Sequence, residues 1–275
     1  MPDPQASRPV DFLLITAIEE ERDALLSKLP GVRKLDRDGT GAHTYYDASV
    51  ATRRQDGSVY RVVVTSLSGM GPLKGAIKAG AVIQRWKPAH VLMVGIAGGV
   101  AGEVAAGDVM VASQVADYTV GKVRDEGARE ERWVAYPADA NLFDAALNFP
   151  TGWEDLVAAE RPKPDKPERH VGVIASGGDV VASKKQIEIY LADWPKLIGV
   201  EMEGGGVAAG LHDDIERPRF LMIRGVSDLA NAKNNAAMKK AWRAYACHVA
   251  AAYAIGLLRD GPVQASLRSA PPNPR

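Results

Sequence analysis

Three groups of carboxylates, each placed after a short apolar run, are the residues of this chain best suited to chemistry. Glu201 and Glu203 follow the run 197–200, Asp228 follows a run that starts at 219, and Glu19–Glu21 follow the run 11–17. Parallel strands deliver such residues to the edge of a sheet, where open α/β folds bind ligands. Because no metal-ligand cluster accompanies them, these acids indicate proton and hydroxyl chemistry on a small polar substrate.

Each of these acids also has a purely structural explanation. Glu201 and Glu203 are two positions apart at a strand-to-helix junction, so their side chains should point in different directions and one of them can serve the backbone. Glu19–Glu21 suit the first turn of a helix, where acids complement the helix dipole, and at most one should reach a ligand. Asp228 is either an N-cap or turn residue, or a proton donor in a partly desolvated site.

Two glycine-rich segments, 69–71 and 95–99, either let the backbone approach a ligand closely or simply form tight turns. Neither has the Lys-Ser/Thr pair of a phosphate-binding P-loop, and neither is a dinucleotide-binding fingerprint in the right context. The five histidines are scattered along the chain, without metal-ligand spacing. We therefore expect neither a metal nor a cofactor.

Composition and charge exclude several classes of protein. The 275 residues include 34 Lys+Arg and 34 Asp+Glu, and the formal net charge of +0 offers no basic excess for nucleic acid. No apolar run reaches the ~18 residues that span a bilayer, and the N-terminus lacks a basic segment followed by an apolar core. We expect a cytoplasmic protein that binds neither nucleic acid nor membrane.

Strand and helix patterns alternate along the chain, which predicts a single α/β domain at 10–260 with a central mixed, mostly parallel sheet flanked by helices. Segments 1–9 and 261–275 are expected to be disordered tails. The expected strands are 11–17, 43–51, 59–66, 89–95, 107–113, 170–176, 197–201 and 219–225. The expected helices are 19–29, 72–86, 138–148, 183–193, 202–211 and 235–258.

Three local predictions complete this organisation. Thr16 and Glu19 have the spacing of a capping box at the start of the first helix. Residues 95–99 are expected to form a flexible loop after the strand 89–95, because four of the last five residues before 100 are small. Residues 121–137 are charged and are expected to run irregularly over a site.

Seven motifs in a fixed order carry a family resemblance. They are Ala17-Ile18-Glu19-Glu20-Glu21, Ser68-Gly69-Met70-Gly71, Gly95-Ile96-Ala97-Gly98-Gly99, Gly107-Asp108-Val109, Ser176-Gly177, Val200-Glu201-Met202-Glu203 and Arg224-Gly225-Val226-Ser227-Asp228. No single motif is diagnostic, but the ordered set resembles the nucleoside phosphorylase / nucleosidase superfamily. Within it, the chain is most similar to the 5′-methylthioadenosine/S-adenosylhomocysteine nucleosidases.

The resemblance implies a nucleoside phosphorylase-like fold and purine nucleoside N-ribosyl hydrolysis of an adenine nucleoside, without a cofactor. Asp228 would protonate the purine N7, Glu203 would bind the ribose hydroxyls, and Glu21 would position the attacking water. The family also implies a homodimer whose partner closes part of each site. The other substrate contacts that the resemblance implies are Ser68, Ile96, Ala97, Gly98, Val180, Val181, Glu201, Met202 and Ser227.

Water and phosphate are the two candidate nucleophiles, and the sequence favours water. A phosphorylase needs arginines that converge on an oxyanion. Met93 stands where phosphorylases of the family have an arginine, and a carboxylate from Glu19–Glu21 would repel phosphate. Arg22, Arg53 or Arg54 would weaken this interpretation if it folded inward.

The chain departs from the family nucleosidases around the base. The segment Ser176-Gly177-Gly178-Asp179-Val180 has an extra glycine and lacks an aromatic residue to stack on adenine. Stacking would then be weaker or would come from Tyr118, Trp133 or Tyr136. The segment Gly204-Gly205-Gly206 replaces bulkier residues and would widen the pocket or loosen the start of a helix.

A basic cluster in the charged segment keeps a nucleotide substrate open. Lys122, Arg124, Arg129 and Arg132 would either admit a phosphate or form a solvated loop. Alternatives to the adenine nucleosidase are therefore a nucleotide (AMP/ATP-type) nucleosidase effector, a phosphate-dependent phosphorylase, and a non-catalytic nucleoside-binding protein on the same fold.

Overall fold

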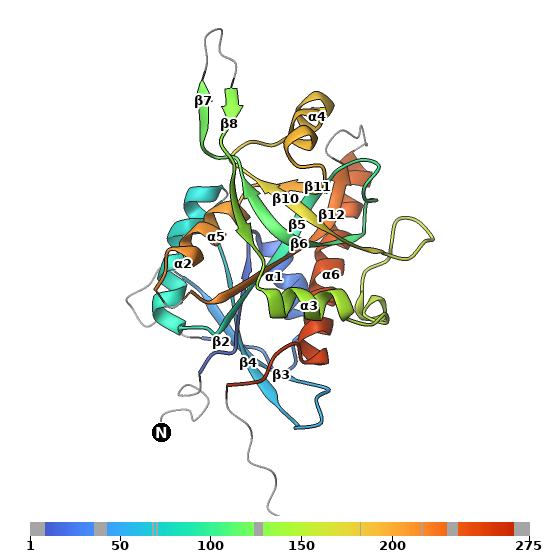
Figure 1. Ribbon diagram of the computed structural model, residues 1–275. Helices are drawn as coiled ribbons and strands as arrows, with labels where there is room; N and C mark the ends of the chain where they lie inside the picture. Colours follow the sequence, from blue (N-terminus) through green and yellow to red (C-terminus); the bar gives the residue numbers. More distant parts are fainter. Residues whose placement is uncertain are drawn as a thin grey trace, which may run out of the picture.

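A computed structural model describes residues 9–35, 43–67, 69, 71–123, 129–181, 183–215, 217–229 and 236–266. In these ranges a mixed sheet lies between two layers of helices (Figure 1). The strands are β1 (Phe12–Thr16), β2 (Arg33–Lys34), β3 (Tyr45–Ala51), β4 (Val59–Ser66), β5 (His90–Gly99), β6 (Val109–Asp117), β7 (Gly121–Val123), β8 (Arg129–Glu131), β9 (Val134–Pro137), β10 (Arg169–Ser176), β11 (Leu197–Glu201) and β12 (Arg219–Leu229). The helices are α1 (Glu19–Leu26), α2 (Pro72–Trp86), α3 (Ala140–Asn148), α4 (Lys184–Asp193), α5 (Gly204–His212) and α6 (Ala236–Asp260).

The main sheet has the strand order β11-β10-β6-β12-β5-β1-β4-β3-β2, with β9 beside β6. β1 pairs in parallel with β4 and β5, and β5 pairs in parallel with β12. The last residues of β5 also pair with β11, Gly98 with Val200 and Gly99 with Gly199. Because β11 therefore contacts both β10 and β5, the sheet bends around the end at which the candidate acids lie. The predicted α/β class with a mixed, mostly parallel sheet is confirmed.

Helices cover both faces of the sheet, as expected for apolar strands that are buried on both sides. α2 and α5 pack together on one face, and α1, α3 and α6 cover the other (Figure 1). Each layer encloses its own apolar cluster, and α6, the longest helix, packs along β12 and β5. No helix among the described residues is long and apolar enough to cross a membrane.

The predicted flexible loop at 95–99 is wrong, because these residues continue strand β5. Gly95 is paired with Arg224, and Ile96 with Gly225, so the segment has strand neighbours along its length. A side chain at Gly95 would collide with the Arg224 guanidinium and the Glu21 carboxylate. The glycine is therefore needed for close packing of two charged groups and not for flexibility.

The start of α1 also differs from prediction. Ile18 is the N-cap, and the Glu21 carboxylate accepts hydrogen bonds from the backbone nitrogens of Ala17 and Ile18, at 2.7 and 3.1 Å. Thr16 instead exchanges a 2.9 Å hydrogen bond with Ser66 at the end of β4. The predicted capping box from Thr16 to Glu19 is therefore two residues too early. In the observed cap, Glu21 is the acid whose side chain accepts the hydrogen bond from the N-cap backbone nitrogen.

Two segments expected to be irregular contain regular contacts. Within 121–137, β7 pairs with β8 and β9 pairs with β6, and the β7–β8 hairpin projects from the body (Figure 1). Residues 261–266, placed in a tail by the sequence, pack on the domain. The Val263 nitrogen donates to the Tyr60 hydroxyl at 3.2 Å, and the Ser266 nitrogen donates to Asp11 at 2.6 Å.

The segment Gly204-Gly205-Gly206 begins α5 and lets that helix approach its neighbours. A Cβ at Gly204 would lie 2.6 Å from the Met222 sulfur, and one at Gly205 would lie 2.9 Å from the Asp117 carboxylate carbon. A Cβ at Gly206 would collide with the Pro72 carbonyl, at the start of α2. These glycines serve close helix packing instead of widening a pocket.

The collision predicts that Gly206→Ala destabilises the protein. The Pro72 carbonyl is main chain and cannot rotate away, so overpacking of about 1–3 kcal/mol should exceed the ~1 kcal/mol that alanine gains in a helix. Urea unfolding followed by circular dichroism measures the change. Gly80→Ala is the matched control, because nothing lies within 4 Å of the added Cβ and it should stabilise α2. Equal stabilisation by both variants would contradict this packing.

Candidate functional site

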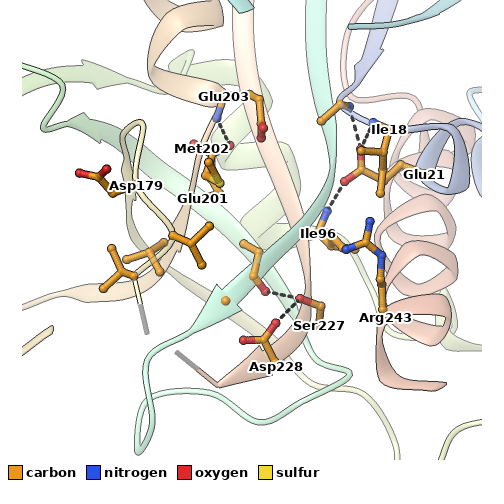
Figure 2. Close-up of a pocket in the computed structure, with 16 residues that line it drawn as sticks. Ile18, Glu21, Ile96, Asp179, Glu201, Met202, Glu203, Ser227, Asp228 and Arg243 are labelled. Carbon is orange, nitrogen blue, oxygen red and sulfur yellow. Dashed lines mark hydrogen bonds between the residues drawn. The ribbon is translucent and has the colours of Figure 1, made fainter. Parts of the chain in front are cut away.

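A cavity of about 230 Å³ opens where β1, β5, β11 and β12 come together (Figure 2). Every predicted site residue within the described part of the chain lines this cavity, and Ser68 lies outside the described residues. The lining residues are Ala17, Ile18, Glu21, Ile96, Ala97, Gly98, Asp179, Val180, Val181, Val200, Glu201, Met202, Glu203, Ser227, Asp228 and Arg243.

Glu21 is the only member of its acidic triplet that lines the cavity. Its side chain is 3% exposed, whereas Glu19 and Glu20 lie on the surface. One carboxylate oxygen caps α1, and the other accepts a 2.8 Å hydrogen bond from the backbone nitrogen of Ile96 on β5 (Figure 2). Burial raises the pKa of Glu21, while the nearby Arg224 charge and these backbone bonds oppose the rise. The carboxylate is thus held rigidly between two strands.

Arg224 is the functional residue that the motif analysis quoted but to which it gave no role. The side chain is fully buried, ion-paired with Glu201, and close enough to Glu21 to act on its charge. Its Nη2 also donates to the Met93 sulfur at 3.3 Å, while Nε and Nη1 have no hydrogen-bond partner within the described ranges. An arginine inside the apolar run Phe-Leu-Met-Ile-Arg-Gly-Val was the available signal, because arginine is almost never fully buried unless paired.

Glu201 and Glu203 point in different directions, as their spacing predicted. Glu201 accepts from the backbone nitrogens of Glu203 and Gly204, at 3.1 and 2.9 Å, and so ties the end of β11 to the start of α5. Glu203 turns to the α2 side, where its carboxylate lies 3.4 Å from the Gly71 nitrogen. Burial, and then the neighbouring Glu201 charge, raise the pKa of Glu203 to about 7, against the lowering effect of Arg224.

Asp228 occupies another side of the cavity and is oriented by its neighbour. The Ser227 hydroxyl lies 2.8 Å from the Asp228 carboxylate and 3.2 Å from the Ala97 carbonyl on β5 (Figure 2). Ser227 is buried, while Asp228 is partly exposed to the cavity. Of the three predicted catalytic carboxylates, the site therefore holds Asp228 at the end of β12, and Glu21 and Glu203 at other edges.

None of the aromatic residues considered for base stacking lines the cavity. Tyr118 is buried beneath Gly177 and packs against Tyr190, with ring centroids 5.0 Å apart, and Trp133 joins the same cluster. Tyr136 instead packs against His212. The cavity wall offers aliphatic side chains in their place: Ile18, Ile96, Val180, Val181, Val200 and Met202.

The arginines that would have favoured phosphate do not enter this cavity. Arg22 pairs with Asp23 at 2.8 Å, and Arg54 pairs with Asp56 at 3.4 Å. Arg53 also does not line the cavity. Arg243, on α6, is the cation that lines it, and its Nε donates to the exposed Glu20 at 2.7 Å. Within the described ranges, the cavity therefore carries more acids than bases.

No described member of the basic cluster lines the cavity, although Arg129 lies 3.8 Å from the carboxylate of Asp179, which does line it. Arg129 pairs with Glu131 at 3.0 Å and donates to the carbonyls of Tyr118 and Thr119. Lys122 and Arg132 are exposed and do not line the cavity, and Arg124 lies outside the described residues. No group of His, Cys, Asp and Glu residues in the described part of the chain is arranged to hold a metal ion.

Comparison with protein families and curated sequences agrees with this geometry. The model of the phosphorylase superfamily matches residues 11–259. A 5′-methylthioadenosine/S-adenosylhomocysteine nucleosidase of Maridesulfovibrio salexigens is 27% identical over 231 residues, which cover 82% of this chain and 88% of that protein.

Solved structures share the fold at lower identity. A 5′-methylthioadenosine/S-adenosylhomocysteine nucleosidase of Neisseria meningitidis, in complex with methylthio-immucillin-A, superposes with a TM-score of 0.70 at 22% identity, covering 90% of this chain and 98% of that one. The futalosine hydrolase of Helicobacter pylori superposes with a TM-score of 0.68 at 20% identity, covering 90% and 97%.

The raised pKa of Glu203 predicts how stability depends on pH. Between the ordinary carboxyl value of 4.5 and about 7, the folded protein keeps a proton that the unfolded chain releases, so stability falls as pH rises through this window. Glu203→Gln cannot ionise and should be more stable than the parent at pH 8, by up to about 3 kcal/mol. At pH 4.5 the two should differ little.

Urea unfolding at pH 4.5 and pH 8 measures this difference. Glu188→Gln is the control, since Glu188 is exposed on α4 and makes only a 3.7 Å surface pair with Lys184. An identical pH dependence in the parent and in Glu203→Gln would show that Glu203 is ionised at ordinary carboxyl pH.

Proposed function

This chain belongs to the phosphorylase superfamily, and on that premise we propose that it is a purine nucleoside N-ribosyl hydrolase. Its substrate is an adenine nucleoside such as methylthioadenosine or adenosylhomocysteine. The observation that carries the proposal is the convergence of Glu21, Glu203 and Asp228 from three separate elements on one cavity (Figure 2).

The arrangement suits cleavage of an N-glycosidic bond. As the bond between the sugar C1′ and the base nitrogen breaks, positive charge grows on the sugar and negative charge on the base, as in glycoside hydrolysis. Carboxylates beside the sugar stabilise this state more than the ground state. Glu203 binds the ribose hydroxyls, and Asp228, oriented by Ser227, donates a proton to the purine N7.

Water as the nucleophile follows from the surroundings of Glu21. The Glu21 carboxylate accepts the water proton, and the water oxygen attacks C1′. Burial favours the neutral acid, but Arg224 and the three backbone nitrogens favour the ionised form that a base requires. The Nη1 of Arg224, which has no hydrogen-bond partner among the described residues, lies near the same carboxylate and adds positive charge there. Phosphate in this place would meet a buried carboxylate, which disfavours phosphorolysis.

The alternative functions can be distinguished from hydrolysis by their products. A phosphorylase requires phosphate and releases ribose 1-phosphate. A non-catalytic binding protein takes up nucleoside without turnover. The homodimer that the family resemblance implies stays a prediction, and so does the cytoplasmic location.

A substrate panel tests the reaction itself. Methylthioadenosine, adenosylhomocysteine, adenosine, inosine and AMP are incubated with the protein, with and without phosphate, and the products are separated by chromatography. We expect free adenine and the free sugar without added phosphate. Turnover that depends on phosphate would instead identify a phosphorylase and contradict the role of Glu21.

The role of Asp228 predicts that Asp228→Asn lowers kcat by about 10²–10⁴-fold, because the amide cannot donate the proton that a carboxylic acid supplies. The fold should survive, since the Ser227 hydroxyl can bond to the amide oxygen. Asp213→Asn, at an exposed position after α5, is the matched control. Circular dichroism checks folding, and full activity in the Asp228 variant would remove this residue from the mechanism.

A further inference from the structure

A second cavity, of about 340 Å³, lies next to the candidate active site. Both cavities have Ala17 and Ile18 in their walls, so they are neighbours across the turn that joins β1 to α1. The other lining residues of the second cavity are mostly polar or charged and come from α1, from β3 and the residues just before it, from the end of β4 and the residue after it, and from α2. These are Glu19, Arg22, His43, Thr44, Tyr46, Ser66, Leu67 and Lys78.

Lys78 is the unusual residue of this cavity. It is only 2% exposed, and no described residue forms a hydrogen bond or an ion pair with its ammonium group. The ammonium group lies over the ring of Tyr45, whose centroid is 5.3 Å from Nζ. Burial lowers the pKa of Lys78 to about 8, so most molecules still carry the charge at neutral pH.

The other charged groups of the cavity do not neutralise Lys78. Arg22 is paired with Glu19 at 3.6 Å and with Asp23 at 2.8 Å, and both acids are exposed. Burial, and then the nearby positive charge of Lys78, lower the pKa of His43. Ser66, at the end of β4, and Thr44, just before β3, also line the cavity.

The position of the cavity relates it to one side of the proposed substrate. In the proposed function the purine base lies beside Asp228. Glu203, which binds the ribose hydroxyls, lies beside Gly71 at the start of α2. Lys78 is seven residues further along this helix, about 10 Å from its first turn. Because Ala17 and Ile18 line both cavities, a substituent that extends from the ribose past Ile18 enters the second cavity.

We propose that the second cavity binds an anionic group, phosphate or carboxylate, on the 5′ substituent of the nucleoside, with Lys78 as its charged partner. The inference rests on the proposed function for the position of the nucleoside. It also replaces the basic cluster 122–132 as the place where a nucleotide phosphate would enter.

The energetic argument is that a largely buried ammonium on a cavity wall, without an ion-pair partner among the described residues, costs folding stability. Buried charges are normally paired, and an isolated one is expensive to desolvate. A chain that places lysine among Tyr45, Ser66 and Leu67, where methionine of similar volume would fit, departs from the most stable choice. Such departures are expected where a ligand supplies the missing partner.

Lys78→Met tests this inference, because it removes the charge and keeps the volume. We expect kcat/KM for adenosylhomocysteine, which carries a carboxylate, or for AMP, which carries a phosphate, to fall by at least about tenfold. The value for methylthioadenosine, whose substituent is neutral, should change by less than about twofold. The variant should also have a higher Tm than the parent, because a desolvated charge has been removed.

Lys74→Met is the matched control, since Lys74 lies one turn earlier on α2, is exposed and is outside both cavities. It should leave the ratio of the three kcat/KM values unchanged. A loss confined to adenosylhomocysteine identifies a carboxylate site, and a loss confined to AMP identifies a phosphate site. An equal loss on all three substrates, or no loss on any, would overturn the inference.

Calorimetry separates failure of this inference from failure of the proposed function. If no substrate releases adenine, the proposed function is wrong, and titration of AMP and adenosine into the parent and Lys78→Met still tests the cavity. We expect the parent to bind AMP more tightly than adenosine, and Lys78→Met to lose that preference. A preference that is the same in both proteins would reject Lys78 as the anion partner.

Discussion

The buried ion pair of Arg224 with Glu201, beside the Glu21 carboxylate, is the interaction on which the rest of the site depends. A guanidinium with no exposure needs its carboxylates, and removal of one partner from such a cluster typically costs about 3–5 kcal/mol. Glu201 in turn accepts from the first nitrogens of α5, and Glu21 caps α1. One arginine thereby fixes two helix starts relative to the sheet. Because Glu203 is the N-cap of α5, its position follows from the same cluster.

Glycines make this cluster geometrically feasible. Any side chain at Gly95 would occupy the space in which Arg224 and Glu21 meet, and any side chain at Gly206 would separate α5 from the first turn of α2. Close approach of α5 to α2 also places Glu203 beside Gly71, so that a carboxylate faces a backbone nitrogen at the cavity edge. The segments that look flexible in the sequence are therefore among the most tightly packed parts of the domain.

Sequence patterns were sufficient for the fold class and for the location of the cavity at the strand ends. Alternating apolar runs and helix signals predicted β1, β4, α2 and β11 within a residue or two, because local periodicity sets them. Acids at strand ends pointed to Glu19–Glu21, Glu201 with Glu203, and Asp228, because parallel strands present their ends at a common edge, and the family resemblance selected Glu21 and Glu203 among them. These predictions depend on local properties of the chain.

The errors arise where long-range pairing decides the structure. Residues 95–99 are strand because β12 and β11 supply hydrogen-bond partners distant in sequence, which glycine content alone does not reveal. Tyr118 and Trp133 pack against Tyr190 of α4 and against Trp194, which follows that helix, and this packing is set by tertiary contacts. Arg224 was visible as a charge within an apolar run, but its partners lie 23 and about 200 residues away.

Two buried cations, Arg224 near the first cavity and Lys78 in the second, have different surroundings. Arg224 is surrounded by carboxylates that lower its electrostatic cost, so its charge contributes to the architecture and to the ionisation of Glu21. Lys78 has an aromatic ring and hydroxyl-bearing neighbours but no described carboxylate partner, so its charge lowers folding stability. A buried charge without a structural partner is best explained by a partner that arrives with the ligand. On this reasoning the acids determine which bond is cleaved, and the second cavity determines which substituent the nucleoside carries.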